Sequence, residues 1–253
     1  IASQNAVGYA NGVSYWMGRD KFYRYDGSVQ PLRCDLRKFI FGDFNTQQYD
    51  QVTAGTNEAF NEVWWFYCSA ESVQNNRYVI YNYLEDVWYY GNLGRTAWLD
   101  SGLRDFPLAA TYSNNLVNHE QGVDDAETDV TTAIPAFVTS AEFDIEDGHQ
   151  FSFVSRVLPD IRFDGSTASS PLATLTLLPL TNSGSGYNTP LSAGGNSGGQ
   201  IVRSAVLPIE EFTGQLDTRI RGRQMSIKLE SDAVGVTWQL GSPRIDLRPD
   251  GRR

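Results

Sequence analysis

Glu62-Val-Trp-Trp-Phe-Tyr-Cys68 is the stretch that decides the fold of this 253-residue chain. Aromatic and β-branched residues fill it, and these residue types favour a half-buried strand. Successive side chains of a strand point to opposite faces, so we expect at least two of the four rings to lie in a core. Similar short runs occupy residues 12–18 and 77–83, and no window of 11 residues carries a helical stripe. The sequence therefore predicts an all-β fold.

The aromatic stretch belongs to a repeat. Tyr15-Trp16 precedes Trp64-Trp65 by 49 residues, and Tyr112 follows Trp64 by 48. Repeats of about 40–50 residues built from four short strands are typical of β-propeller blades, which bury their faces against one another. We predict propeller-type blades over residues 1–132.

Each repeat also contains a second signature, a bulky strand that ends in a polar turn. The three copies occupy residues 22–27, 79–83 and 116–120. Residues 81–88 also predict a β-hairpin with Leu84-Glu85-Asp86 at its tip.

Residues 133–253 differ from the first part in composition and in hydrophobic pattern. Only one tryptophan, Trp238, lies beyond residue 98. Residues 224–230 and 234–240 alternate between apolar and polar, which is typical of a sheet with one buried face. Further strands are expected at 136–145, 151–163, 171–181 and 201–207. We predict a β-sandwich or a closing blade here, joined to the blades near residues 130–135, where an acidic loop and Pro135 occur.

A loop rich in small polar residues interrupts this second part. Thirteen of the 19 residues at 182–200 are Gly, Ser or Asn. Such a segment buries too little apolar surface to offset its ordering entropy, so we expect a flexible loop, or one that a partner orders.

The net charge of −10 is distributed unevenly. Residues 1–150 carry 9 Lys and Arg against 21 Asp and Glu, whereas residues 151–253 carry 11 against 9. An acidic first part is a poor ligand for nucleic-acid phosphates. Seventeen of the 20 basic residues are Arg, the cation preferred at interfaces because its planar fork is weakly hydrated.

An arginine cluster near the C-terminus is the candidate functional site. Arg219, Arg221 and Arg223 are two residues apart, so a regular strand would place them on one face. Met225 shares their parity, which requires that Gly222 mark a bulge or that the strand leave the core there. A subunit contact would use Arg219, Arg221, Arg223, Arg248, Arg252 and Arg253. The alternative is solvated arginines with local ion pairs of little energetic value.

The motifs of common catalytic centres are absent from the sequence. There are two histidines, His119 and His149, no Gly-x-Ser-x-Gly motif, no phosphate-binding loop and no dinucleotide fingerprint. Cys34 and Cys68 are too few and too dispersed for a zinc site, and their pairing stays open. Carboxylates crowd residues 124–129 and 144–147, where calcium is possible chemically but solvated loops are commoner. We expect no enzymatic activity, no metal and no cofactor.

Four segments carry a family resemblance: residues 61–67, 78–85, 88–98 and 240–253. They resemble the tail-nozzle or hub proteins of short-tailed bacteriophages and prophages, often described as packaged-DNA stabilisation proteins. The resemblance implies a propeller-bearing subunit of a ring, in the form of a hexamer, that extends the portal channel. It also implies contacts with copies of itself, with head–tail adaptor and tail proteins, and with double-stranded DNA that passes without specific binding.

The resemblance further implies a virion protein assembled in the bacterial cytoplasm. No run in the sequence approaches the roughly 20 apolar residues that a membrane helix needs, so we expect no membrane anchor. Nozzle proteins are longer than this chain, and Ile1 stands where a complete chain would have Met, so we expect a processed chain or a fragment. The alternative function is a carbohydrate-binding or glycoside-cleaving propeller at a host surface, because exposed aromatic rings stack on sugars and many propeller glycosidases use two carboxylates.

Overall fold

The computed structural model describes residues 1–144, 150–180 and 204–251. The fold is all-β, as predicted: apart from helix α1 (Arg37–Gly42) and 3₁₀ turns at Tyr49–Gln51 and Glu58–Phe60, every regular element in the described part is a strand. The chain divides into two compact units, Ile1–Gln121 and Gly122–Arg253. This division lies before the predicted join at residues 130–135.

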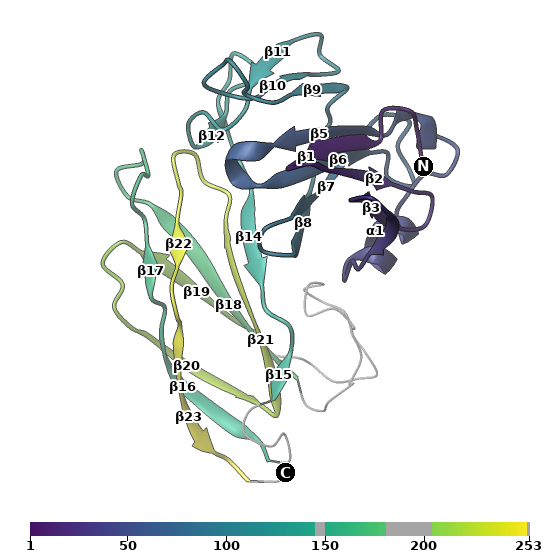
Figure 1. Cartoon of the computed structure of the whole chain (residues 1–253). Helices are drawn as coiled ribbons and strands as arrows, with labels where there is room; N and C mark the ends of the chain where they lie inside the picture. The colour runs from purple at the N-terminus through teal and green to yellow at the C-terminus, as the bar shows by residue number, and fades with distance from the viewer. Residues whose placement is uncertain (145–149, 181–203, 252–253) are drawn as a thin grey trace. The chain divides into compact units, whose positions relative to one another are not determined.

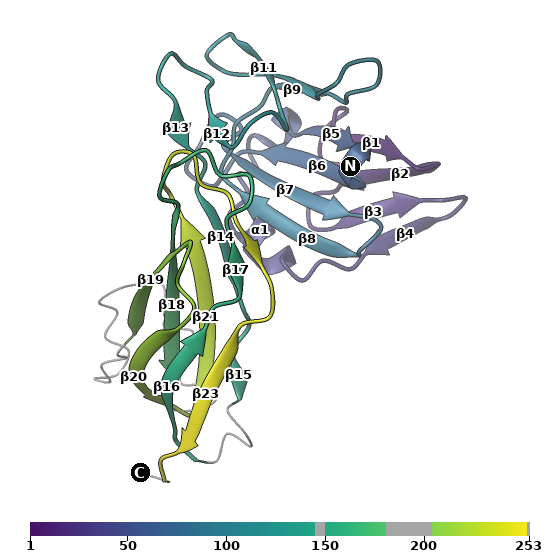
Figure 2. The ribbon, with the colours of Figure 1, turned by 90° about the vertical axis from the view of Figure 1, so that its left-hand side faces the viewer.

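The first unit contains three antiparallel sheets in which each strand pairs with the next along the chain (Figure 2). Sheet I contains β1 (Val7–Ala10), β2 (Val13–Met17), β3 (Phe22–Tyr25) and β4 (Val29–Leu32). Sheet II contains β5 (Thr53–Asn57), β6 (Glu62–Tyr67), β7 (Arg77–Asn82) and β8 (Val87–Gly91). Sheet III has three strands, β9 (Ala97–Leu99), β10 (Leu108–Ala110) and β11 (Leu116–Asn118).

The sequence repeat corresponds to this succession of sheets. The aromatic pairs at 15–16 and 64–65 lie on the second strands β2 and β6, and Tyr112 follows the second strand β10. The second signature of each repeat falls on the third strand of its sheet, β3, β7 or β11. The hairpin at 81–88 is confirmed, because β7 and β8 pair through Asn82 and Val87 around a four-residue turn.

Sheet II buries both of its faces, which explains its run of aromatic residues. Trp65 and Tyr67 turn toward sheet I, where Tyr15, Met17 and Phe22 complete a core. Trp64 and Phe66 turn the other way and pack with Trp98 of sheet III. All four rings of 64–67 are at most 8% exposed. The prediction of at least two core rings is thus confirmed.

The second unit contains two main sheets, of five and three strands (Figure 1). Sheet IV has the order β14 (Ala136–Thr139), β21 (Gln224–Ser231), β18 (Leu172–Leu180) and β19 (Ala205–Glu210), and β15 (Phe143–Asp144) also pairs with β21. Sheet V has the order β20 (Leu216–Gly222), β16 (Ser152–Leu158) and β23 (Arg244–Pro249). Two short ladders join β12 (Asp124–Asp125) to β13 (Thr132–Ala133) and β17 (Ile161–Arg162) to β22 (Gln239–Leu240).

Sheets IV and V share one apolar core. Val154, Val157 and Ile220 contribute to it from sheet V. Leu175, Leu177 and Leu229 contribute from sheet IV. The alternating strands of the sequence therefore do bury one face each, and they bury it against the other sheet of the same unit.

One predicted strand is wrong and one segment lies outside the described residues. Residues 234–238 form a turn and an irregular segment in place of a strand, and only Gln239–Leu240 pairs. Gly235 adopts a φ of +77°, which a strand does not allow, and its N–H donates to the Asp124 carboxylate. The loop predicted at 182–200 and the start of the strand predicted at 201–207 lie outside the described residues.

Candidate functional site

The structure divides the predicted arginine cluster. On β20 the exposed Arg219 and Arg221 alternate with the buried Thr218 and Ile220. Arg223 lies beyond the end of the strand, in the connection to β21. β20 ends at Gly222, where the sequence predicted either a bulge or a strand that leaves the core. A Cβ there would lie 2.9 Å from the Gln224 carbonyl oxygen, so the tight connection requires glycine.

Two of the arginines have local partners. The guanidinium of Arg221 lies 4.3 Å from the centre of the Phe151 ring, and that of Arg223 lies 4.6 Å from it. Arg221 also forms an ion pair with Asp250 at 2.5 Å and donates to its carbonyl oxygen at 2.9 Å. These contacts tie the end of β20 to the end of β23. Local contacts of this kind are what the alternative interpretation, arginines with local ion pairs, expects of Arg221.

Arg219 and Arg248 remain exposed cations of sheet V. Within the described ranges neither residue forms an ion pair. Arg248 and Arg221 lie opposite Phe153 in the register of the sheet, on its solvent-facing side. Arg252 and Arg253 lie outside the described residues.

Carboxylates gather at one end of the strands of the first unit, a feature that the sequence did not predict. We call the following four residues the end cluster. Glu58 follows β5, and Glu62 begins β6. Asp100 follows β9, and Glu120 lies just beyond β11. The Asp100 carboxylate accepts the N–H of Glu58 at 2.9 Å. The Glu62 carboxylate accepts Nε1–H of Trp64 at 3.0 Å.

Asn57, at the end of β5, connects this cluster to the interior. It is fully buried, and its Nδ2 donates to the Glu120 carboxylate at 3.2 Å. Burial of the Glu62 carboxyl raises its pKa, and the nearby Glu120 carboxylate raises it further, against the opposing bond from Trp64. Burial likewise raises the pKa of Glu120. The cluster thus holds two carboxylates whose charged forms are disfavoured by the fold.

A substitution at Glu62 tests this electrostatic cost. Because the pKa is raised in the folded state, the stabilisation from Glu62 is present at low pH and is lost as pH rises through that pKa. Glu62→Gln keeps the acceptor for Trp64 and removes the charge. We expect a higher Tm than wild type at pH 7, with a difference that shrinks toward pH 4.

Glu85→Gln, at the exposed hairpin tip, is the matched control and should change neither Tm nor its pH dependence. A Glu62→Gln protein that melts below wild type at pH 7 would contradict the electrostatic account.

Neither cysteine forms a disulfide: Cys34 and Cys68 are free. Burial raises the pKa of each thiol to about 11. Since the thiolate is the nucleophile, we expect Cys68, which has no exposed surface, to resist iodoacetamide at pH 8 in the folded protein. In the folded protein, mass spectrometry should show slow addition of one group, at Cys34. Two added groups should appear only after unfolding. Rapid labelling of Cys68 in the native state would contradict the buried position of this thiol.

The residues that the structure describes contain no cluster of three or more His, Cys, Asp or Glu side chains suited to a metal ion. In the first acidic loop, carboxylates instead accept backbone N–H groups: Asp124 binds Gly235, and Asp125 binds Glu127. The second loop extends beyond the described residues at position 145. No helix in the described part of the chain is long and apolar enough to span a bilayer.

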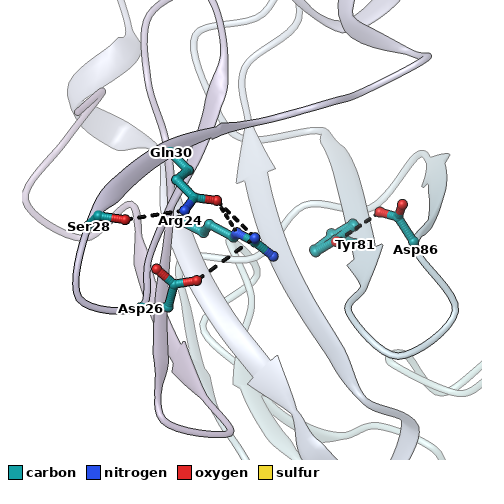
Figure 3. A network of polar contacts seen from close by, with 6 residues as sticks. All are labelled: Arg24, Asp26, Ser28, Gln30, Tyr81 and Asp86. Carbon is teal, nitrogen blue, oxygen red and sulfur yellow. Dashed lines mark hydrogen bonds and ion pairs between the residues drawn. The ribbon is translucent and has the colours of Figure 1, made fainter.

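The contact between sheets I and II has an apolar centre and a polar edge. At this edge Arg24 donates to Gln30 at 2.9 Å and lies 3.8 Å from the Asp26 carboxylate (Figure 3). Figure 3 shows its guanidinium pointing from sheet I toward Tyr81 of sheet II. The Tyr81 hydroxyl donates to Asp86 at 2.9 Å, and burial together with this bond raises its pKa above the usual range.

The opposite face of sheet I is largely exposed among the residues that the structure describes, and we call it the open face of sheet I. It comprises Val7, Tyr9, Trp16, Tyr23, Tyr25 and Val29, which the register places together. Tyr9 is 65% exposed and Val29 63%. Trp16 and Tyr23 stack on each other with ring centres 5.5 Å apart. The alternation Phe22-Tyr-Arg-Tyr25, with aromatic residues on both faces, was the available sequence signal.

No protein-family model matches the chain, and no curated protein is significantly similar to it. The arrangement of the residues therefore carries the functional argument. It combines stacked sheets, an open aromatic face, a carboxylate end cluster and exposed arginines.

Proposed function

We propose that the chain is a non-enzymatic structural component of a short-tailed phage tail. In this proposal it belongs to a nozzle or hub ring that extends the portal channel, retains packaged DNA and lets it pass on ejection. The observation that carries the proposal is the open face of sheet I. Sheet II buries both of its faces between neighbours, whereas Val7, Tyr9, Tyr25 and Val29 on one face of sheet I are exposed in the described part of the chain. A contiguous exposed patch of this kind marks an interaction surface.

We take the three sheets as blades of a β-propeller and the second unit as a β-sandwich. The first strands β1, β5 and β9 lie next to one another in sequence order, as the innermost strands of propeller blades do. Sheets IV and V enclose one core, which supports the sandwich.

The carboxylate end cluster suits a DNA conduit. The first strands themselves carry no acidic residue, so an acidic lining along them is not supported. Glu58, Asp100 and Glu120 lie beyond the ends of strands instead. Negative charge at the mouth of a channel repels phosphates and lets DNA pass without adhering.

Ring contacts between copies are part of this proposal, with six copies in the ring. Arg219 and Arg248 are available to meet the acidic first unit of a neighbouring copy. Such rim pairs contribute orientation more than affinity, about 0–1 kcal/mol each. Head–tail adaptor and tail proteins would occupy the two ends of the ring.

The virion assignment is tested on particles. Phage particles made with the gene deleted should lose DNA after packaging, and a plasmid copy should restore them. Mass spectrometry of purified wild-type virions should detect the protein in stoichiometric amounts. Its absence from virions, together with intact packaging without the gene, would refute the proposal.

The second candidate is a carbohydrate-binding or glycoside-cleaving protein. It is favoured by exposed rings at Tyr9 and Tyr25 and by the neighbouring carboxyls of Glu62 and Glu120, whose raised pKa values resemble those of acid–base pairs. Binding on a glycan array that is lost in Tyr9→Ala would support this candidate. Hydrolysis of a bound glycan that is lost in Glu120→Gln would make it an enzyme.

A further inference from the structure

We propose that Asn57, Glu62 and Glu120 form a binding site for a divalent cation, with calcium preferred over magnesium. The three side chains come together between sheets II and III, at the end of their strands. No local motif in the sequence indicates such a site, since Asn57 and Glu120 are 63 positions apart. The inference goes beyond the proposed function and does not depend on it, because a cation here would link two sheets of the same chain in any setting.

A buried oxygen of Asn57 is the observation that points to a ligand. Asn57 has no exposed surface, and its Oδ1 is buried without a hydrogen-bond partner among the residues that the structure describes. An acceptor left unpaired in the interior destabilises the fold. Nδ2 of the same amide donates to the Glu120 carboxylate at 3.2 Å. Because Oδ1 is bonded to the same carbon as Nδ2, it lies beside that carboxylate and is available to a cation.

Glu62 lies next to Asn57 on the same face of sheet II. The register pairs Asn57 of β5 with Glu62 of β6, and directly opposed residues point their side chains to one face of a sheet. Trp64 and Phe66 share this face with Glu62 and pack toward sheet III. Glu120 comes from sheet III, just beyond β11. Oxygen atoms from two sheets therefore meet at one place.

Each of the two carboxylates has one oxygen to offer. Oε2 of Glu62 accepts Nε1–H of Trp64 at 3.0 Å, and Oε1 of Glu120 accepts the amide of Asn57. Within the described ranges the second oxygen of each carboxylate accepts no hydrogen bond, and neither carboxylate forms an ion pair. The site thus combines three oxygen ligands with two negative charges that no Lys or Arg in that part of the chain balances.

The electrostatics of the neighbouring groups agree with this geometry. Burial and then the Glu120 charge raise the pKa of Glu62, and burial and then both charges raise the pKa of Tyr78. Glu62, Glu120 and Tyr78 are therefore close neighbours in a partly desolvated place. A bound divalent cation would relieve the repulsion between the two carboxylates.

The other two members of the end cluster do not belong to the site. Both oxygens of the Asp100 carboxylate accept backbone N–H groups, one from Glu58 at 2.9 Å and one from Ser101 at 2.6 Å. After burial, the charges of Glu58 and Asp100 raise the pKa of Tyr83, which neither Glu62 nor Glu120 affects. The end cluster thus contains two separate pairs of carboxylates, and Asn57 serves only the pair of Glu62 and Glu120.

The ligand set favours calcium. Calcium binds about six to eight oxygens in a flexible geometry and accepts bidentate carboxylates, whereas magnesium requires a near-ideal octahedron and keeps several waters. Two glutamates and one amide from two sheets suit the flexible geometry, with water as the remaining ligand. Such a set is compatible with the absence of any cluster of three or more His, Cys, Asp or Glu side chains in the described residues. With only two charged ligands, we expect a dissociation constant of about 0.1–1 mM.

The first test is the Tm of the purified protein at pH 7 in EDTA, in calcium chloride and in magnesium chloride. A ligand that binds the folded state alone raises Tm. We expect calcium to raise the Tm of the first unit, and magnesium at equal concentration to raise it less. No response to calcium would overturn the inference and would indicate that water satisfies Asn57. An equal response to magnesium would overturn the preference for calcium.

Three variants locate the cation by isothermal titration with calcium chloride. Glu62→Gln and Glu120→Gln each remove one charged ligand, so each should raise the dissociation constant for calcium at least about tenfold. Glu58→Gln is the matched control, because it removes the same charge from the other pair of the end cluster, and it should keep the wild-type constant. Unchanged binding in Glu120→Gln, or equal weakening in Glu58→Gln, would overturn the site.

The stability of Glu62→Gln should also depend on calcium. In EDTA this variant should melt above wild type, because the two carboxylates of the wild-type protein repel each other. Saturating calcium should remove or reverse the difference, because only the wild-type protein keeps both charged ligands. A difference that calcium leaves unchanged would contradict the site.

Terbium provides a spectroscopic test of the position. This ion occupies calcium sites, and its emission can be excited through a tryptophan only when the ring is close. Because Trp64 donates to Glu62, we expect terbium emission excited through tryptophan, its loss on addition of excess calcium, and weak emission in Glu120→Gln. Emission of wild-type strength in Glu120→Gln would place the ion elsewhere and overturn the inference.

Discussion

Replacement of Trp65 by alanine is expected to lower the free energy of unfolding of the first unit by about 3–5 kcal/mol. Trp65 has no exposed surface and is among the largest fully buried side chains of the protein. Its ring centre lies 5.0 Å from that of Phe22 and 6.2 Å from that of Trp88. Its Nε1–H donates to the carbonyl oxygen of Ala6 at 3.0 Å, so the substitution also leaves a buried acceptor without a donor.

Thermal and urea unfolding, monitored by circular dichroism and tryptophan fluorescence, measure this effect. The two units need not melt together, and the loss should appear in the transition of residues 1–121, while that of the second unit stays in place. Tyr89→Ala is the matched control, because Tyr89 lies on the same sheet but is 49% exposed. We expect its effect to be within about 1 kcal/mol. Equal losses from both variants would contradict the assignment of sheet II as the buried centre.

The second large effect is expected at Gly55, on β5. A Cβ added there would lie 2.3 Å from Cδ1 of Trp98, inside the contact distance of any two atoms. Trp98 cannot retreat easily, since its ring stacks on Trp64 at 5.1 Å and its Nε1–H donates to the carbonyl oxygen of Thr56 at 2.7 Å. Gly55→Ala should therefore separate sheet III from sheet II and cost about 3 kcal/mol.

Gly42→Ala is the matched control for Gly55→Ala. Nothing lies within 4 Å of a Cβ at Gly42, so this variant should keep the wild-type Tm or exceed it slightly. The double variant Gly55→Ala/Trp98→Ala should be less destabilised than the sum of its single variants, because the clash disappears with the ring. Full additivity would show that Trp98 does not occupy this position.

The local features of the first unit could be predicted because they depend on neighbours in sequence. The four consecutive aromatic residues at 64–67 predict a strand that buries both of its faces. The segment between Asn82 and Val87 has the length of a hairpin turn. The repeat predicted that successive sheets would have the same order of strands along the chain. Gly222 was recognisable as a break because the parity of Arg221 and Met225 could not hold through it.

The remaining features depend on contacts between distant residues. The fit of Trp98 on Gly55 joins strands 43 residues apart, and no local pattern shows it. The end cluster brings Glu62 near Glu120 only after three sheets have stacked. Residues 234–240 have strand periodicity, but the bond from Gly235 to Asp124 selects a turn. The stacking of Arg221 on Phe151 likewise joins residues far apart in the sequence, and no local pattern shows it.

Electron microscopy of the purified protein tests the central claim most directly. The account predicts a ring of several copies with a central opening, and loss of that ring in Tyr9→Glu. A particle of one chain with the open face of sheet I exposed, unchanged by Tyr9→Glu, would contradict it.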